Sequence, residues 1–121
     1  MFTLTKTVTF EAAHDLPAHD GKCARLHGHS WKATVELRGE HLQEAGPKIG
    51  MLADYYDIGA RLKQLVDSHL DHFYLNNTTG LVNPTSENLA WWIFQQLKPA
   101  LPLLVAVTVE ETCTSSARYE P

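Results

Sequence analysis

Three segments of this chain alternate apolar and polar residues with a period of two, the pattern of strands that bury one face of a sheet. The first runs from Phe2 to Ala12, with Lys6 interrupting its apolar set; the second covers 31–37 and the third 103–109. The residues predicted to face inward are Phe2, Leu4, Val8, Phe10, Ala12, Trp31, Ala33, Val35, Leu37, Leu103, Val105, Val107 and Val109. The pattern therefore predicts at least three half-buried strands.

Two helical segments separate the second and third of these strands. Apolar residues at helical spacing predict a helix from Asp57 to about His72, and residues 76–80 then form a polar loop. Thr85 is a plausible N-cap for a second helix, which Pro99 or Pro102 would stop. The order of two strands, two helices and a further strand predicts an α+β fold with an antiparallel sheet. No repeat or linker divides the chain, so we expect residues 1–121 to form one domain.

Composition and charge exclude several classes of protein. The net charge of −4, with scattered Lys and Arg, argues against a nucleic-acid binder, which usually carries a clustered basic face. No apolar run is long enough to cross a membrane, and the first residues lack the layout of a secretory signal. Two cysteines, Cys23 and Cys113, do not indicate a disulfide framework. We therefore expect a cytoplasmic protein with no nucleic-acid or membrane partner.

If the alternation of each strand is continued past its apolar residues, four polar residues are also predicted to point inward. The first strand leads to His14, the second leads backwards to His29 and His27, and the third leads to Glu111. An unpaired buried polar group costs roughly 1–3 kcal/mol, so polar residues at such positions indicate a partner or a ligand. A hydrogen-bonded core histidine is the alternative for any one of them taken alone.

The histidine spacing favours a metal site. His27 and His29 present two imidazoles from one strand to one point, and His14 is a plausible third ligand. Cys23 lies four residues before His27 and has two interpretations. It is a candidate base or nucleophile if a metal lowers its pKa, or a fourth ligand that would close a structural zinc site. The spacing alone leaves both open.

Asp71 and His72 resemble an acid–histidine couple. On a continuous helix, however, adjacent side chains diverge by about 100°, and His72 would lie on the apolar stripe while Asp71 points away. Either the helix ends near these residues, or Asp71 does not contact His72 directly.

Six blocks of sequence, in order, resemble the 6-pyruvoyl-tetrahydropterin synthase family over essentially the whole chain. They are Phe10–His14, Lys22–His29, Gly50–Tyr55, Leu70–His72 with Leu75 and Asn76, Asn83–Asn88 and Val109–Thr112. The resemblance implies a T-fold, in which a four-stranded antiparallel sheet has two helices between its strand pairs. Such protomers close a barrel by oligomerisation, so it implies a homohexamer of two trimers with active sites between subunits. Tyr55 stands where the family more often has Phe.

The resemblance also implies which residues carry the chemistry. His14, His27 and His29 would hold Zn²⁺, which leaves Cys23 free to act as the general base. Members of the family act on 7,8-dihydroneopterin triphosphate, whose side-chain oxygens zinc can polarise.

The remaining implied residues recognise the substrate or move protons. His72, assisted by Asp71, would be the proton-relay partner of the base. Glu111 would anchor the pterin ring by accepting hydrogen bonds from its N–H and amine groups. Thr85 and Glu87 would contribute to the same pterin site.

The three residues between Cys23 and His27 resemble the carboxy-forming branch of the family, the 6-carboxy-tetrahydropterin synthases of queuosine and 7-deazaguanine biosynthesis. The ending 111–114 is similar to the same branch. This resemblance implies a lyase that releases triphosphate and acetaldehyde and leaves a 6-carboxy-tetrahydropterin. Two alternatives stay open: a 6-pyruvoyl-tetrahydropterin synthase, which stops after triphosphate elimination, and a zinc- or pterin-binding protein without turnover.

Overall fold

The structure is a computed structural model that describes residues 1–121, and it contains one antiparallel sheet with strand order β1-β2-β3-β4. The strands are β1 (Phe2–His14), β2 (His27–Gly39), β3 (Leu104–Thr112) and β4 (Ser115–Tyr119). Between the two strand pairs lie α1 (Tyr55–Leu65), the short α2 (Leu75–Thr78) and α3 (Ser86–Leu97). This arrangement confirms the predicted α+β class and the four-stranded antiparallel sheet.

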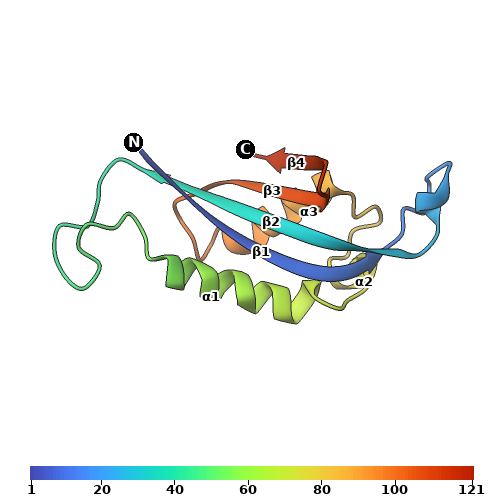
Figure 1. The fold of residues 1–121 in the computed structure, drawn as a ribbon, viewed down its shortest axis with the longest axis horizontal. Helices are drawn as coiled ribbons and strands as arrows, with labels where there is room; N and C mark the ends of the chain where they lie inside the picture. Colours follow the sequence, from blue (N-terminus) through green and yellow to red (C-terminus); the bar gives the residue numbers. More distant parts are fainter.

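The helices cover one face of the sheet, with α1 under β1 and α3 under β3 and β4 (Figure 1). Alternation along β2 buries Trp31, Ala33, Val35 and Leu37 on this face, each at most 2 % exposed. Trp31 also donates its indole N–H to the carbonyl of Ala12, 3.1 Å away. The opposite face of the sheet carries polar side chains such as Thr7, Thr34 and Glu36, and no helix covers it.

No helix combines the length and apolar character that a membrane span requires.

The prediction for the third strand was wrong at its beginning. Leu103 and Val105 were expected to face inward, but Leu104 is fully buried while Leu103 is 38 % exposed. An irregularity opposite Glu36 and Leu37 shifts the register, so that Leu104 pairs with Leu37. Beyond it the predicted parity is restored, because Val107 pairs with Val35.

The first helix also ends earlier than predicted. α1 passes into one π-helical turn, Val66–Leu70, and the chain then leaves the helix at Asp71. His72 takes a left-handed conformation (φ 63°), so its side chain is exposed and does not lie on the apolar stripe. The predicted loop after it begins as the helical turn α2.

The N-cap of α3 is confirmed. The Thr85 side chain accepts a hydrogen bond from the Asn88 N–H at 3.2 Å, and the helix ends at Leu97, two residues before Pro99.

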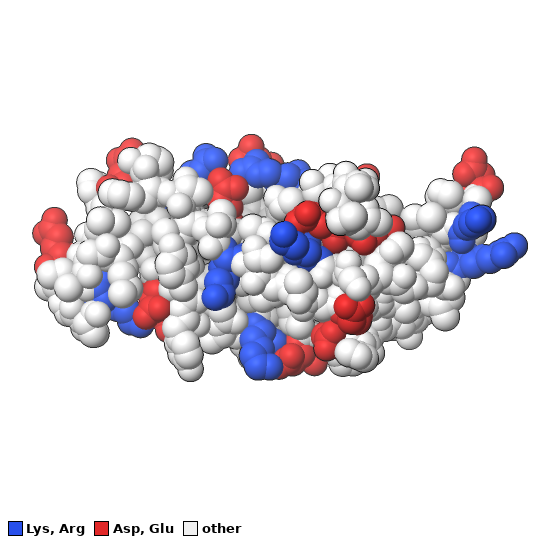
Figure 2. Space-filling view, viewed as in Figure 1, with Lys and Arg blue, Asp and Glu red and all other residues white.

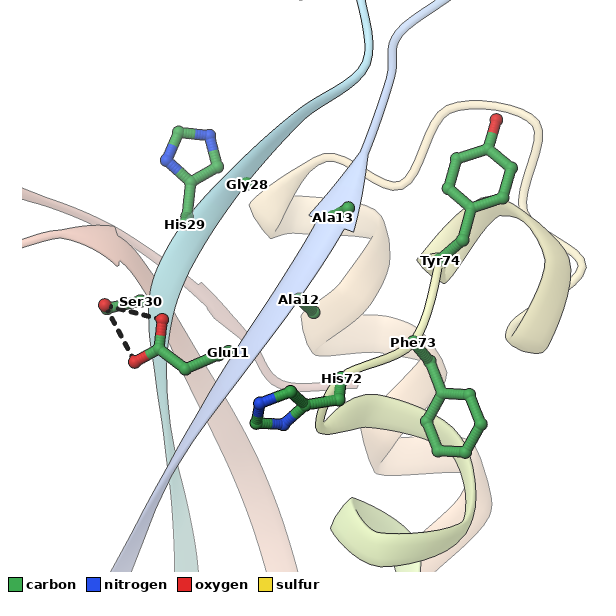
Figure 3. Close-up of a pocket in the computed structure, with 9 residues that line it drawn as sticks. All are labelled: Glu11, Ala12, Ala13, Gly28, His29, Ser30, His72, Phe73 and Tyr74. Atoms are coloured by element: carbon green, nitrogen blue, oxygen red, sulfur yellow. Dashed lines mark hydrogen bonds between the residues drawn. The ribbon is translucent and has the colours of Figure 1, made fainter.

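The turn at Asp71 and His72 is fixed against the edge of β1, and Figure 3 shows His72 beside this edge. The Glu11 N–H donates to Asp71 Oδ1 at 2.9 Å, and the His72 N–H donates to the Glu11 carbonyl. The Ala13 N–H donates to the carbonyl of Phe73. The rest of the β1 edge and the outer edge of β4 have no strand partner.

Charged side chains of both signs are interspersed over the surface (Figure 2). On the uncovered face Glu36 contacts Arg38 and Arg118, each at 3.0 Å, which ties β2 to β4. The Arg118 hydrogen bond, followed by that of Arg38, lowers the pKa of Glu36 below its ordinary value.

We predict that Glu36→Gln lowers the free energy of unfolding at pH 7 by about 1 kcal/mol, the upper range for partly exposed ion pairs. Because the folded-state pKa is lowered, this stabilisation is present above the unfolded pKa and is lost as pH falls through the folded pKa. Urea denaturation measures the stabilisation at pH 7, and its loss in a pH series that falls well below 4.5, the ordinary pKa of Glu. Glu40→Gln, which removes an exposed carboxylate without an ion pair, is the control. An unchanged difference at low pH would contradict the interpretation.

Candidate metal centre

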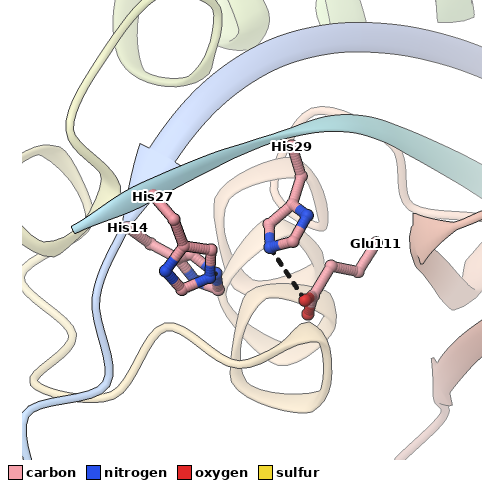
Figure 4. Close-up of side chains that lie close together, drawn as sticks. All are labelled: His14, His27, His29 and Glu111. Carbon is pink, nitrogen blue, oxygen red and sulfur yellow. Dashed lines mark hydrogen bonds and ion pairs between the residues drawn. The ribbon is translucent and has the colours of Figure 1, made fainter. Parts of the chain in front are cut away.

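Four side chains converge where β1 ends and β2 begins (Figure 4). Ligand atoms of His14, His27, His29 and Glu111 all lie within 4.8 Å of one another, so the group could hold a metal ion. His14 pairs with His27 across the two strands, and β3 brings in Glu111. The alternation of side chains along the three strands predicted that these four polar residues face the same side of the sheet, and the structure places them there. Cys23 is not part of this group.

Hydrogen bonds fix the tautomers of two of the rings. His14 Nδ1 lies 2.8 Å from the carbonyl oxygen of Pro84, and His27 Nδ1 lies 2.6 Å from that of Arg25. A carbonyl oxygen only accepts, so each Nδ1 carries the proton and donates it. Both Nε2 atoms therefore present lone pairs, which is how a second-shell carbonyl orients a metal-binding histidine.

The two lone pairs face each other. His14 Nε2 and His27 Nε2 are 3.0 Å apart, and two acceptors at that distance repel unless a cation or proton lies between them. His14 is 1 % exposed, and burial is the main cause that lowers its pKa, so its imidazole is neutral at pH 7. A neutral imidazole at His14, with its Nε2 turned toward that of His27, suits the binding of a transition-metal ion.

His29 and Glu111 complete the cluster. Glu111 Oε1 is 2.9 Å from His29 Nε2, yet this buried nitrogen has no hydrogen-bond partner, because the contact is close but poorly aligned. An unsatisfied buried nitrogen at the centre of the group is a second indication that a ligand belongs there. The donor set of three imidazoles and one carboxylate fits a divalent metal ion.

Asp71 and His72 form a second pair, at the edge of β1. His72 Nδ1 lies 2.9 Å from Asp71 Oδ2, which resolves the alternative left by the sequence: the helix ends, and the two side chains meet. The Glu11 N–H, and then His72, lower the pKa of Asp71, which keeps it ionised. The carboxylate can orient the imidazole and leave Nε2 free toward a hollow of about 530 Å³ lined also by Ser30 and Tyr74 (Figure 3).

The other predicted site residues are not among the four side chains of the cluster, although Thr85 directly follows Pro84, whose carbonyl contacts His14. Cys23 is half-buried in the 3₁₀ turn Lys22–Ala24, within the loop that joins β1 to β2. Thr85 is occupied as the N-cap of α3, and Glu87 is exposed and accepts a hydrogen bond from Ser86.

Sequence analysis missed the parts played by Pro84 and Arg25, which orient His14 and His27, and by Glu11, which holds Asp71. All three act through peptide groups, and every residue type carries a carbonyl, so no side-chain pattern identifies them.

Comparison with known proteins identifies the family of the chain. Residues 3–121 match the family described as 6-pyruvoyl tetrahydropterin synthase. The chain belongs to this family. A Synechocystis sp. 6-carboxy-5,6,7,8-tetrahydropterin synthase is 50 % identical over 120 residues, which cover 98 % of this chain and 93 % of the relative. The Haemophilus influenzae 6-carboxy-5,6,7,8-tetrahydropterin synthase is 33 % identical over 99 % of both chains.

A solved structure from the family has the same fold. The 6-pyruvoyl tetrahydropterin synthase of Caenorhabditis elegans superposes with a TM-score of 0.83 at 30 % identity, covering 99 % of this chain and 95 % of that one. The family and the T-fold inferred from the resemblance are therefore confirmed.

We predict that the purified chain binds one divalent metal ion and that His27→Ala loses it. Removing a direct ligand should weaken binding by more than the 10–100-fold typical of losing an outer-shell partner. Elemental analysis and competition with a chelator measure this, and exposed His41 provides the matched control, His41→Ala.

Glu111→Gln separates two roles for the carboxylate. Stoichiometric metal in this variant is expected if Glu111 binds substrate, whereas loss equal to that of His27→Ala would make it a metal ligand. Full metal binding by His27→Ala would contradict the assignment of the centre.

Proposed function

We propose that this protein is a zinc-dependent 6-carboxy-5,6,7,8-tetrahydropterin synthase of queuosine and 7-deazaguanine biosynthesis. It converts 7,8-dihydroneopterin triphosphate to 6-carboxy-tetrahydropterin and releases triphosphate and acetaldehyde. The convergence of the His14 and His27 lone pairs, 3.0 Å apart, is the observation that carries the proposal. Identity to two 6-carboxy-5,6,7,8-tetrahydropterin synthases over nearly the whole chain supports the carboxy-forming reaction.

The reaction balances with one water. The substrate side chain has three carbons: the first stays on the ring as the carboxylate, and the other two leave as acetaldehyde. Triphosphate leaves from the terminal carbon. The ring is reduced from the dihydro to the tetrahydro level as the first side-chain carbon is oxidised, so no external redox cofactor is required.

Three imidazoles, those of His14, His27 and His29, hold the zinc ion in this proposal. When bound there, zinc supplies Lewis-acid polarisation of the side-chain oxygens and acidifies the neighbouring protons. The carbonyls of Pro84 and Arg25 keep two of these rings in the binding tautomer.

Cys23 is the proposed general base, because its thiolate can remove a proton from the substrate side chain. His72 returns a proton, and ionised Asp71 holds the imidazole by Nδ1 so that Nε2 does the transfer. Proton exchange with a bound substrate requires accessible groups. The Cys23 side chain is partly exposed, and the His72 side chain is mostly exposed.

Glu111 anchors the pterin ring by accepting hydrogen bonds from its N–H and amine groups. Its side chain is 28 % exposed beside the metal cluster, so one end of the pterin would lie close to the zinc ligands. Thr85 retains a hydroxyl proton to donate, and Glu87 a carboxylate to accept, at the beginning of α3. These two residues complete the proposed pterin site.

The single domain, residues 1–121, functions as a homohexamer of two trimers in the cytoplasm. Cys23 and His72 lie in separate parts of one chain, and the sheet has an uncovered face and two open edges. Pairing of open edges would close a barrel and remove the exposed strands. A site between subunits would then combine the Cys23 of one chain with the His72 of another.

A second candidate is a 6-pyruvoyl-tetrahydropterin synthase, favoured by the likeness to the Caenorhabditis elegans enzyme. It differs only in stopping after triphosphate elimination. A zinc- or pterin-binding protein without turnover is the remaining alternative, and it predicts neither product.

The deciding measurement is incubation of the zinc-loaded protein with 7,8-dihydroneopterin triphosphate, with acetaldehyde and the pterin products assayed together. We expect acetaldehyde and 6-carboxy-tetrahydropterin in equal amounts. Triphosphate without acetaldehyde would assign the pyruvoyl-forming reaction, and no product at all would support a binding protein.

We predict that Cys23→Ala keeps stoichiometric zinc and the native assembly but loses about 10²–10⁴-fold of turnover, the usual contribution of a general base. Cys113→Ala, which removes the other, exposed thiol, should keep full activity. Zinc content, mass in solution and acetaldehyde production give the three readouts. Loss of zinc from Cys23→Ala would show that the thiol is a ligand and the site structural.

A further inference from the structure

Two cations in the β1–β2 loop have no carboxylate partner. Lys22 and Arg25 are exposed and form no ion pair, and they are the only Lys or Arg between His14 and Ser30. Of the other eight Lys and Arg, five pair with carboxylates, namely Lys32, Arg38, Lys48, Lys63 and Arg118. Lys6, Arg61 and Lys98 also form no ion pair, but they lie outside this loop, on β1, on α1 and after α3. In a chain of net charge −4, two free cations close together in sequence are available for an anionic ligand.

The loop is ordered by backbone hydrogen bonds. The Arg25 N–H donates to the Lys22 carbonyl at 3.0 Å, closing the 3₁₀ turn, and the Leu16 N–H donates to the Cys23 carbonyl at 2.8 Å. The two cations therefore flank Cys23 on one short turn. Lys and Arg side chains gather at this end of the molecule, which projects beyond the sheet (Figures 1 and 2).

The same loop is coupled to the metal cluster. The carbonyl of Arg25 accepts the hydrogen bond from His27 Nδ1, so the Arg25 peptide is fixed against one of the converging imidazoles. The two acidic residues of the loop contact other groups. Asp15 accepts a hydrogen bond from the Tyr74 hydroxyl, and the fully exposed Asp20 lies 3.9 Å from His19. Neither neutralises Lys22 or Arg25.

We infer that Lys22 and Arg25 bind the triphosphate group of the substrate and stabilise it as it leaves. This inference rests on the proposed function and adds the residues that recognise the leaving group. Arg suits bidentate binding of phosphate oxygens, and Lys adds a compact charge. Cleavage of the carbon–oxygen bond transfers its electron pair to the triphosphate oxygen, where nearby cations lower the barrier.

The placement matches the chemistry of the substrate. The triphosphate is attached to the same three-carbon side chain that the metal and Cys23 act on, so the group must lie within a few bonds of both. Lys32, the next cation along β2, is neutralised by Glu110 at 3.5 Å on the opposite face of the sheet from the cluster. The turn that carries Cys23 thus holds two cations beside the proposed base in sequence, and its Arg25 peptide contacts the cluster residue His27.

The test uses zinc-loaded Lys22→Gln, Arg25→Gln and the double variant, with Arg61→Gln as the matched control. Arg61 is also exposed and without an ion pair, but it lies on α1. Binding of magnesium triphosphate to the holoenzyme is measured by calorimetry at low ionic strength, with zinc content checked afterwards. KM is measured for 7,8-dihydroneopterin triphosphate. Binding affinity is measured for 7,8-dihydroneopterin, which lacks the triphosphate.

Each single substitution should weaken magnesium triphosphate binding and raise KM by about tenfold, the lower end for a charge-assisted hydrogen bond. In the double variant, affinity for magnesium triphosphate should fall about a hundredfold, while affinity for 7,8-dihydroneopterin and zinc content stay unchanged. Arg61→Gln should behave as the unmodified chain.

Unchanged triphosphate binding in the double variant, or an equal loss in Arg61→Gln, would overturn the inference. A loss of 7,8-dihydroneopterin affinity as large as the loss of triphosphate binding would also overturn it, because the residues would then shape the whole site. The binding measurement is independent of turnover. A chain that binds triphosphate through Lys22 and Arg25 but makes no product would refute the proposed function alone.

Discussion

Two nitrogen lone pairs, on Nε2 of His14 and Nε2 of His27, face each other 3.0 Å apart, and this end of the structure depends on what lies between them. Carbonyls from two different segments impose the arrangement, Pro84 just before α3 and Arg25 in the β1–β2 loop. A cation bound at this point would therefore tie together the sheet, the start of α3 and the loop. Without it, repulsion between the lone pairs opposes the close pairing of the strand ends.

The groups that the proposed chemistry must combine lie on different parts of the sheet. Its covered face carries the hydrophobic core and the metal cluster, whereas the Asp71–His72 pair lies at the β1 edge, where His72 and the cluster residue His29 line the same hollow. His72 is the one non-glycine residue with a positive φ, and peptide groups of Glu11 hold it there. Such a conformation is costly and persists where the surroundings fix it, often at functional sites. A histidine held in this way but exposed is prepared for a group that its own chain does not supply.

Strand parity located the metal cluster because the side-chain period of a strand is two, so one correct apolar position fixes the direction of every residue on it. The same argument failed at Val105, where the register shifts opposite Glu36 and Leu37 and no sequence signal marks it. It failed at His72 for a different reason. The apolar spacing continues past Leu70, but a π-helical turn and a left-handed residue end the helix. The second-shell carbonyls could not be predicted at all, since a hydrogen bond to a peptide oxygen leaves no trace in residue type.

The geometry of Glu111 bears on whether the centre is structural or catalytic. A structural zinc site is closed by four protein ligands, while a catalytic one keeps a position for substrate or water. Cys23 is outside the cluster, so Glu111 is the side chain within reach that could close it. Its carboxylate is poorly aligned with His29 Nε2 and stays 28 % exposed, unlike the buried His14. A carboxylate in that position can accept hydrogen bonds from a ligand without leaving the cluster, and the three imidazoles then retain an open position for a substrate oxygen.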